Sequence, residues 1–345
     1  MWRQKIMVCL AFFLWVSGSF AQETHWIQYD GEEGPGKGKK VVLISGDEEY
    51  RSEEACAMLG KILAKRHGFT CVVLFAIQPR TGEIDPTVQD NIPGMEHLAD
   101  ADLCVMATRF RNLPDEQMKF FVEYVEAGKP FVGLRTATHA FAIPADRKYA
   151  RYSFNAPAAS GWEQGFGRQI LGETWIAHHG EHGVEGTRSQ LVPESENHPI
   201  LRGYQEIFVP TDVYRVRLPL PGDSRILLFG EVTASLEPDS PAVLNAKNEP
   251  KMPIAWVKSY VSPQNPSLQG RVFTTTMGAA VDLQSEGLRR LLVNGVYWAC
   301  GLEAQIPAQA NVDWVDSYHP TWFGFGKHRK GKKPADFSLG KGIGL

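Results

Sequence analysis

Residues 131–141, with the sequence FVGLRTATHAF, predict a buried strand that ends in a turn carrying Arg135 and His139. Ligands of open α/β sheets bind beyond the carboxyl ends of the strands, so we expect both side chains at the rim of a crevice. The alternative is an ordinary buried strand followed by a capped helix. Because arginine is rarely buried without a partner, we favour a functional turn.

Strands alternate with helices on both sides of this stretch. Apolar runs predict strands at 41–45, 69–75, 102–107 and 271–276, and capped or amphipathic patterns predict helices at 52–66, 114–127 and 286–300. Such alternation predicts a parallel sheet with helices on both faces, because right-handed crossovers place them there. The expected fold class is therefore doubly wound α/β.

The second half of the chain departs from this alternation. Residues 142–186 are rich in glycine, aromatic residues and histidine, and predict a long, ordered, functional loop. Further β-type runs predict added antiparallel strands at 207–216, 226–229 and 254–257. The irregular tail, 304–345, holds aromatic residues expected to pack on the domain and a basic run, 327–333, expected in solvent.

The first 21 residues predict a secretory signal peptide. Arg3 and Lys5 precede an apolar run, 6–16, and small residues occupy the cleavage positions before Gln22. The run is too short to span a bilayer, so we expect no stable membrane span after cleavage. We therefore expect a periplasmic or extracellular protein with an extended lead-in at 22–39; the alternative is an uncleaved anchor.

Charge and cysteine content narrow the class of protein. The formal net charge of −3 becomes more negative without the signal peptide, which gives no basis for nucleic-acid binding. Four cysteines remain after cleavage, without the short spacings of zinc or redox motifs: Cys56, Cys71, Cys104 and Cys300. We expect buried free thiols. The alternative is one disulfide, because export would place the protein in an oxidising compartment.

Three familiar catalytic signatures are missing from the sequence. There is no Gly-x-Ser-x-Gly elbow, no Walker phosphate loop and no Gly-x-Gly-x-x-Gly after the first strand. Their absence argues against a serine hydrolase, an NTPase and a Rossmann dehydrogenase.

Three strand-end loops should converge on one crevice. They carry the candidate site residues Asp47, Glu49 and Tyr50 in the first loop, Arg109 and Arg111 in the second, and Arg135, Thr136 and His139 in the third. Arginine forks bind carboxylates, phosphates and sugar oxygens, and the acids could act as bases or metal ligands. The alternative is an ion-pair network that only ties the loops together.

A second constellation is the histidine-rich loop HHGEHG at 178–183. Its side chains His178, His179, Glu181 and His182 could hold a divalent metal such as Zn, Mn or Fe. The glycines indicate a loop rather than a helical zinc motif. Alternatively, His179 or His182 is a general acid or base, or the histidines only cap loops. Arg188 follows shortly after and is a candidate substrate-binding residue.

Several blocks resemble the ThuA-like (trehalose-utilisation) family: GDEEYRS at 46–52, GLRTATHAF at 133–141, HHGEHG at 178–183, and VFTTTMG at 272–278 followed by VYWA at 296–299. The resemblance covers residues 40–303. It implies a class I glutamine amidotransferase-like fold, a flavodoxin-like three-layer αβα sandwich with extra antiparallel strands. It also implies that Arg135 stands where amidotransferases carry their nucleophilic cysteine. A guanidinium cannot be that nucleophile, so we expect no cysteine-dependent amide transfer.

The resemblance implies an exported enzyme of disaccharide or keto-sugar metabolism, whose ligand is a small carbohydrate. The candidate catalytic residues are Arg135, His139, His179 and His182, with a divalent metal on the histidine-rich loop as a variant. One alternative is a catalytically inactive amidotransferase-like module that binds a glycan or a partner protein. Another is a metal-dependent hydrolase of non-sugar esters or amides.

Overall fold

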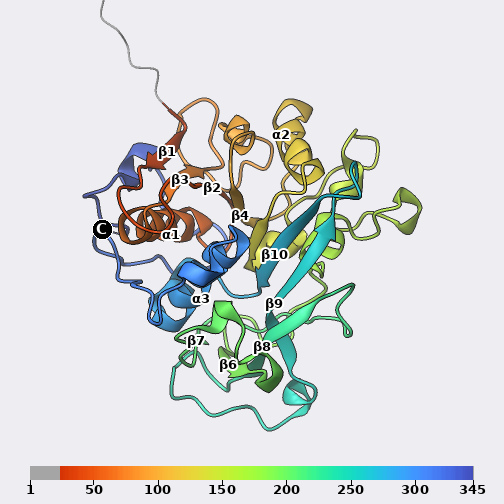
Figure 1. Ribbon diagram of the computed structural model, residues 1–345, viewed down its shortest axis with the longest axis vertical. Helices are drawn as coiled ribbons and strands as arrows, with labels where there is room; N and C mark the ends of the chain where they lie inside the picture. Colours follow the sequence, from red (N-terminus) through yellow and green to blue (C-terminus); the bar gives the residue numbers. More distant parts are fainter. Residues whose placement is uncertain (1–23, 345) are drawn as a thin grey trace, which may run out of the picture.

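The computed structural model describes residues 24–344, so the predicted signal peptide lies outside the described residues. One ten-stranded mixed sheet runs through the molecule in the order β1-β3-β2-β4-β5-β10-β9-β8-β6-β7 (Figure 1). The strands are β1 (Trp26–Tyr29), β2 (Lys40–Gly46), β3 (Thr70–Leu74), β4 (Leu103–Thr108), β5 (Phe131–Leu134), β6 (Thr187–Leu191), β7 (Phe208–Val209), β8 (Arg225–Val232), β9 (Met252–Val261) and β10 (Gln269–Thr275).

The parallel half of the sheet has the flavodoxin-like strand order. Strands β3, β2, β4, β5 and β10 lie side by side and parallel. Helices α1 (Ser52–His67) and α3 (Glu286–Ala299) pack on one face, and α2 (Asp115–Glu126) packs on the other. Successive strand residues point to opposite faces, so Val41 and Val42 of β2 enter different cores. The predicted α/β sandwich is confirmed.

The other half is antiparallel and corrects two sequence expectations. Strands β8 and β9 are longer than their predicted runs, whereas the predicted strand 207–216 forms only the two-residue β7. Its later residues leave the sheet because Thr211 and Asp212 turn into buried polar contacts. The sequence also missed β6, whose buried positions are Thr187 and Ser189 rather than apolar residues.

The predicted lead-in at 22–39 contains a strand that the sequence did not indicate. Strand β1 pairs antiparallel with β3 and forms one edge of the sheet, from Trp26 opposite Leu74 to Tyr29 opposite Cys71. Only Tyr29 of this strand is fully buried, and polar residues surround the run. A short, half-exposed edge strand has little of the alternation that marks a strand in sequence.

The turn after β5 is not followed by a long helix. Residues Arg135–His139 form a short 3-10 helix, and the chain then enters the segment 142–186. That segment is ordered against the sheet: the Trp256 indole and the Thr274 hydroxyl both donate to the Leu171 carbonyl, at 2.7 and 3.0 Å. Gly133 permits this approach, because a Cβ there would lie 2.9 Å from the Leu171 side chain.

The C-terminal tail runs beside α1 and β1 (Figure 1). Lys61 of α1 is fully buried and binds the tail through the Asp316 carboxylate and two backbone carbonyls, at 2.7 to 2.9 Å. Phe323 is buried as predicted, whereas Trp322 is 42% exposed. The basic run is not free in solvent along its whole length, because Arg329 lies 3.3 Å from Glu54 of α1.

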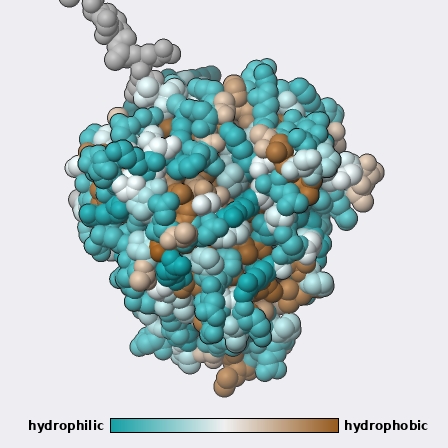
Figure 2. All heavy atoms as spheres, in the orientation of Figure 1, coloured by the Kyte–Doolittle hydropathy of each residue, from teal (hydrophilic) through white to brown (hydrophobic). Residues whose placement is uncertain are grey.

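Hydrophilic side chains predominate on the face in Figure 2, and hydrophobic ones form separate small groups there. Within residues 24–344, no helix combines the length and apolar character that crossing a membrane requires. Cys56, Cys71 and Cys104 are buried free thiols, and Cys300 is a partly buried one.

Candidate functional site

The loops after β2, β4 and β5 meet at the carboxyl ends of the parallel strands, as the sequence predicted. The Asp47 carboxylate accepts hydrogen bonds from the backbone of its own loop and from the Thr136 hydroxyl, at 2.6 Å. Glu48 pairs with both Arg109 and Arg111, with 2.8 Å to the latter. Asp47 and Thr136 are buried, so these contacts hold the loops together and do not form a free binding surface.

Arg135 is buried at the strand-to-helix turn with a left-handed backbone, φ +40°. This conformation is costly for a residue other than glycine, and sharp turns of this kind present the nucleophile in hydrolases. Here the guanidinium lies between the Tyr50 and Tyr214 rings, 4.0 and 4.4 Å from their centroids. It donates to Asp212 Oδ1 at 2.9 Å and to the Thr276 carbonyl at 2.9 Å. Arg135 therefore holds Asp212 and does not face a ligand.

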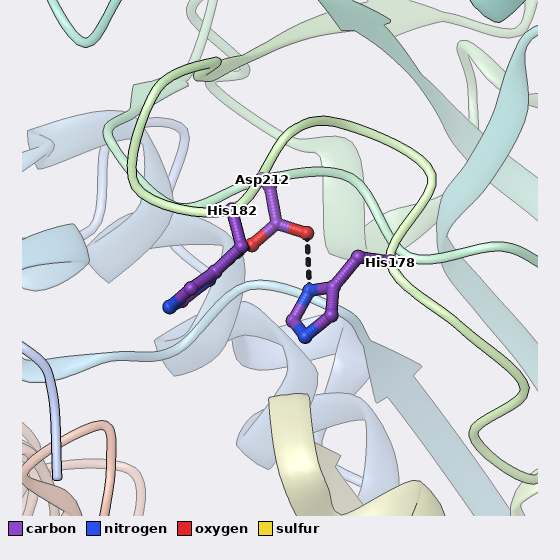
Figure 3. Close-up of side chains that lie close together, drawn as sticks. All are labelled: His178, His182 and Asp212. Atoms are coloured by element: carbon purple, nitrogen blue, oxygen red, sulfur yellow. Dashed lines mark hydrogen bonds and ion pairs between the residues drawn. The ribbon is translucent and has the colours of Figure 1, made fainter.

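Asp212 is the centre of the site, and His178 is its exposed partner (Figure 3). Asp212 Oδ2 lies 2.6 Å from His178 Nδ1. Burial opposes ionisation, but hydrogen bonds from His178 and His182 and the charge of Arg135 hold the pKa of Asp212 well below its usual range. The ionised carboxylate can only accept, so Nδ1 of His178 carries the proton. Its Nε2 points away from Asp212 (Figure 3) and makes no hydrogen bond to any group of residues 24–344.

His182 bridges two carboxylates. Its Nδ1 lies 3.1 Å from Asp212 Oδ1, and its Nε2 lies 3.2 Å from Glu49 Oε1. The hydrogen bond to Asp212, followed by that to Glu49, raises the pKa of His182 to about 9. Both nitrogens therefore donate, and His182 is a cation at neutral pH. It ties the loop after β2 to Asp212, and Tyr50 adds a contact from its hydroxyl at 3.4 Å.

The C-terminal tail supplies an aromatic side to this site. The Phe323 ring lies 5.3 Å from the His182 ring and 5.7 Å from the Tyr50 ring, between centroids. The next residue, Gly324, donates its N–H to the Glu49 carbonyl at 2.7 Å. Phe325 packs on the Arg109 guanidinium at 5.1 Å. A segment more than a hundred residues from the histidine-rich loop in sequence thus completes the site.

Other predicted residues lie elsewhere or are enclosed. His179 points away, with Nε2 2.6 Å from the Lys247 carbonyl, and Glu181 is exposed beside it. Arg188 binds backbone carbonyls of the segment after β8. Arg111 is fully buried, and its guanidinium serves Glu48 and three backbone carbonyls. His179, Arg188 and Arg111 do not join the cluster around Asp212 because each is committed to another contact, and Glu181 points to solvent.

His139 ends the short 3-10 helix after β5 and is 2% exposed. Burial, with the nearby charges of Arg109 and Arg135, lowers the pKa of His139 well below its usual value, so the ring is neutral. Its Nδ1 contacts the Thr138 hydroxyl at 3.2 Å, and Trp175 packs against the ring. Such a residue shapes the crevice and does not exchange protons freely with a ligand.

Sequence reasoning missed Asp212 and Tyr214. Both fall inside the apolar run 207–216, which predicted a strand. The available signal was the polar pair Thr211 and Asp212, which interrupts the β-type run at its middle. In the structure, Thr211 donates to the buried Asp282 at 2.8 Å, and Tyr214 forms an isolated bridge with His178. The interruption marks the point where the chain leaves the sheet for the site.

The arrangement offers two kinds of chemistry. An exposed imidazole whose Nδ1 binds a buried carboxylate can accept and release a proton at Nε2. The same groups could instead bind a metal cation, with His182 giving up a proton, because His178, His182 and Asp212 each offer a ligand atom and these atoms lie within 4.8 Å of one another. Among the side chains predicted to bind a metal, the structure brings together His178 and His182 only.

Comparisons with known proteins found a family model and solved structures to which this chain is similar. The model of the ThuA family, described as trehalose utilisation, matches residues 40–299. A ThuA-like protein from Parabacteroides merdae is 18% identical over 76% of this chain and 90% of its own, with a TM-score of 0.48. A ThuA-like protein from Bacteroides uniformis is 17% identical over 79% and 95%, with a TM-score of 0.47. No curated protein matches the chain.

Proposed function

The chain belongs to the ThuA family, as its motifs predicted, and on this premise we propose that it is an exported enzyme acting on a disaccharide or keto-sugar. His178 is the proton-transfer group. The observation that carries the proposal is the 2.6 Å hydrogen bond from His178 Nδ1 to the buried Asp212. This bond fixes the tautomer and leaves Nε2 pointing away from Asp212 on a partly exposed side chain.

In the proposed reaction, His178 Nε2 takes a proton from a sugar hydroxyl or from the carbon next to a keto group. The imidazolium that forms is stabilised by ionised Asp212, which Arg135 keeps charged and in place. Negative charge developing on a sugar oxygen would be stabilised at short range by the positive charges of His182 and Arg109, although both are also paired with carboxylates. Arg135 is a positioning residue, because it acts only through Asp212.

The histidine-rich loop provides a matched pair of variants for the test. The test is a thermal-shift screen against disaccharides and 3-keto-glucosides, followed by product analysis. H178N should retain its fold and lose turnover by about 10²-fold or more. H179N, one residue away, should keep turnover, since its Nε2 faces the Lys247 carbonyl. Full activity in H178N would refute the role of His178.

The same screen separates enzyme from binding module. Sugar stabilisation of the wild-type protein without any turnover would favour the alternative function, a catalytically inactive amidotransferase-like module that binds a glycan or a partner protein. Turnover of simple esters or amides instead of sugars would favour a hydrolase of another substrate class.

The second candidate function is a metal-dependent carbohydrate enzyme. It is favoured by the clustering of ligand atoms from His178, His182 and Asp212. Zinc, manganese or iron bound there would supply a Lewis acid to a sugar oxygen. Metal analysis of the purified protein tests this version. Stoichiometric metal that is lost in H182N and D212N but kept in H179N would support it, and equal metal content in all variants would refute it.

Export is proposed from the sequence of residues 1–21 alone. Expression of the whole chain in a bacterial host, followed by amino-terminal sequencing of the periplasmic and medium fractions, tests it. A mature start at Gln22 is expected, and an uncleaved chain retained with the membranes would contradict the proposal.

A further inference from the structure

A cavity of about 580 Å³ lies next to the site, between β7, the segment 280–285 and the C-terminal tail. Its volume falls within the range of small-molecule pockets. The lining combines apolar and acidic side chains, including Phe208, Pro210, Trp322, Glu206 and Glu237. None of these residues belongs to the cluster around Asp212, so the cavity is a separate feature of the surface.

Two aromatic contacts in series connect the cavity to His182. The Trp322 ring stacks on Phe323, with centroids 5.0 Å apart and planes 25° apart. Phe323 in turn packs on His182, with centroids 5.3 Å apart. On the opposite side, Pro210 of the lining stands two residues before Asp212. A ligand extending from His178 past His182 would therefore pass the Phe323 ring before it reaches Trp322.

The chemistry of the lining suits a sugar ring. Trp322 is 42% exposed, and one face is covered by Phe323, so the other is available for stacking. Sugars present an apolar C–H face to such rings and hydroxyl donors at the rim. Glu237 is exposed, and its carboxylate has no hydrogen-bond or ion-pair partner within residues 24–344, so it can accept a hydrogen bond from a sugar hydroxyl. Glu206 pairs with Arg188 at 3.5 Å.

The charge of the lining selects against anionic ligands. Two carboxylates line the cavity, and its lining contains no lysine or arginine. A sugar phosphate or a uronic acid would meet like charge there, whereas a neutral sugar would not. The cavity thus fits an uncharged hexose ring.

We propose that this cavity is a second sugar subsite that holds the non-reacting hexose of a neutral disaccharide while the other unit lies at His178. The inference rests on the proposed carbohydrate function. Trp322 and Phe323 come from the tail, beyond the residues 40–299 shared with the family. This subsite is therefore a specificity element that the tail adds to the family domain.

Calorimetric titration of the full-length mature protein with trehalose and with glucose tests the subsite. W322A should weaken trehalose binding about tenfold, equivalent to about 1.4 kcal/mol, and bring its affinity to that of glucose. E237Q, a surface change that does not touch the core, should weaken trehalose binding in the same direction. The matched control is W314A on the same tail, because Trp314 is similarly exposed at 38% and lies outside the cavity.

The outcomes separate the two proposals. Trehalose affinity that is lost in W322A and E237Q but kept in W314A supports the subsite. If wild-type protein binds trehalose and glucose but both cavity variants match W314A, the subsite is refuted and the carbohydrate function stands. If the wild-type protein binds neither sugar at millimolar concentration, the carbohydrate function fails and the subsite fails with it.

Discussion

The substitution Arg135→Met tests the central ion pair of the site. Methionine keeps much of the side-chain length between the two tyrosine rings but leaves Asp212 without its buried cation. Both partners are at most 2% exposed, so water cannot replace the lost charge. Removing one partner of such a buried pair costs about 3–5 kcal/mol. The free energy of unfolding should fall by that amount, since the Thr276 carbonyl loses a donor as well.

Urea denaturation followed by circular dichroism measures this loss, with the transition slope serving as a check on two-state unfolding. The control is Arg147→Met, which removes an ion pair to Asp115 whose side chains are 37% and 43% exposed, and should cost about 1 kcal/mol or less. In a double-mutant cycle, D212N should cost clearly less in the R135M background than in the wild type. A loss below about 1 kcal/mol in R135M, or additive costs, would refute the assigned ion pair.

Three further predictions concern charge and backbone. The hydrogen bond to Asp212 helps raise the pKa of His182 to about 9 in the folded state. The stability that protonated His182 contributes is therefore complete below about pH 6.5 and is lost as the pH rises to about 9. The difference in free energy of unfolding between wild type and H182Q, measured in EDTA, should shrink over that pH range. Burial raises the pKa of Glu53 to about 7, so the folded state holds a proton that the unfolded state releases above pH 4.5; E53Q should remove the fall in stability across that window. Gly165→Ala would put a Cβ 2.1 Å from a backbone oxygen and should cost more than 2 kcal/mol by thermal unfolding, roughly twice the cost of Gly161→Ala, which has open space at a similar φ.

The parallel half of the fold was predictable because it depends on local signals. Each central strand is buried on both faces, so it appears in the sequence as a continuous apolar run, and Gly46, Gly68 and Pro130 mark one end of three of them. The flavodoxin-like arrangement of the strands was implied by the resemblance to the family. The antiparallel half was less predictable, because β6 buries Thr187 and Ser189, and β1 lies at an edge with one fully buried residue. Pairing partners, rather than composition, make these segments strands.

The site was predictable to the extent that it follows strand ends. Arg109, Arg135 and Thr136 could be placed at one crevice because parallel strands end on the same side. Which arginine faces a ligand could not be predicted, because that depends on partners distant in sequence: Asp212 for Arg135 and Glu48 for Arg109. Nor could the sequence predict which histidine of the histidine-rich loop reaches the site, because His178 contacts Asp212 whereas the adjacent His179 contacts the Lys247 carbonyl.

The position of Arg135 explains why the chemistry of this site lies away from the strand-to-helix turn. A turn with positive φ aims its side chain across the sheet end, which suits a nucleophile. With arginine there, the guanidinium instead reaches Asp212 on a different element and is enclosed by Tyr50 and Tyr214. The buried cation offsets the free-energy cost of an ionised Asp212 away from water. The ionised Asp212 in turn orients His178 through a hydrogen bond. A cysteine at position 135 would provide no such charge. The substitution R135C should therefore disorder the His178 ring rather than create a thiol enzyme, and NMR of the His178 tautomer would report that loss directly.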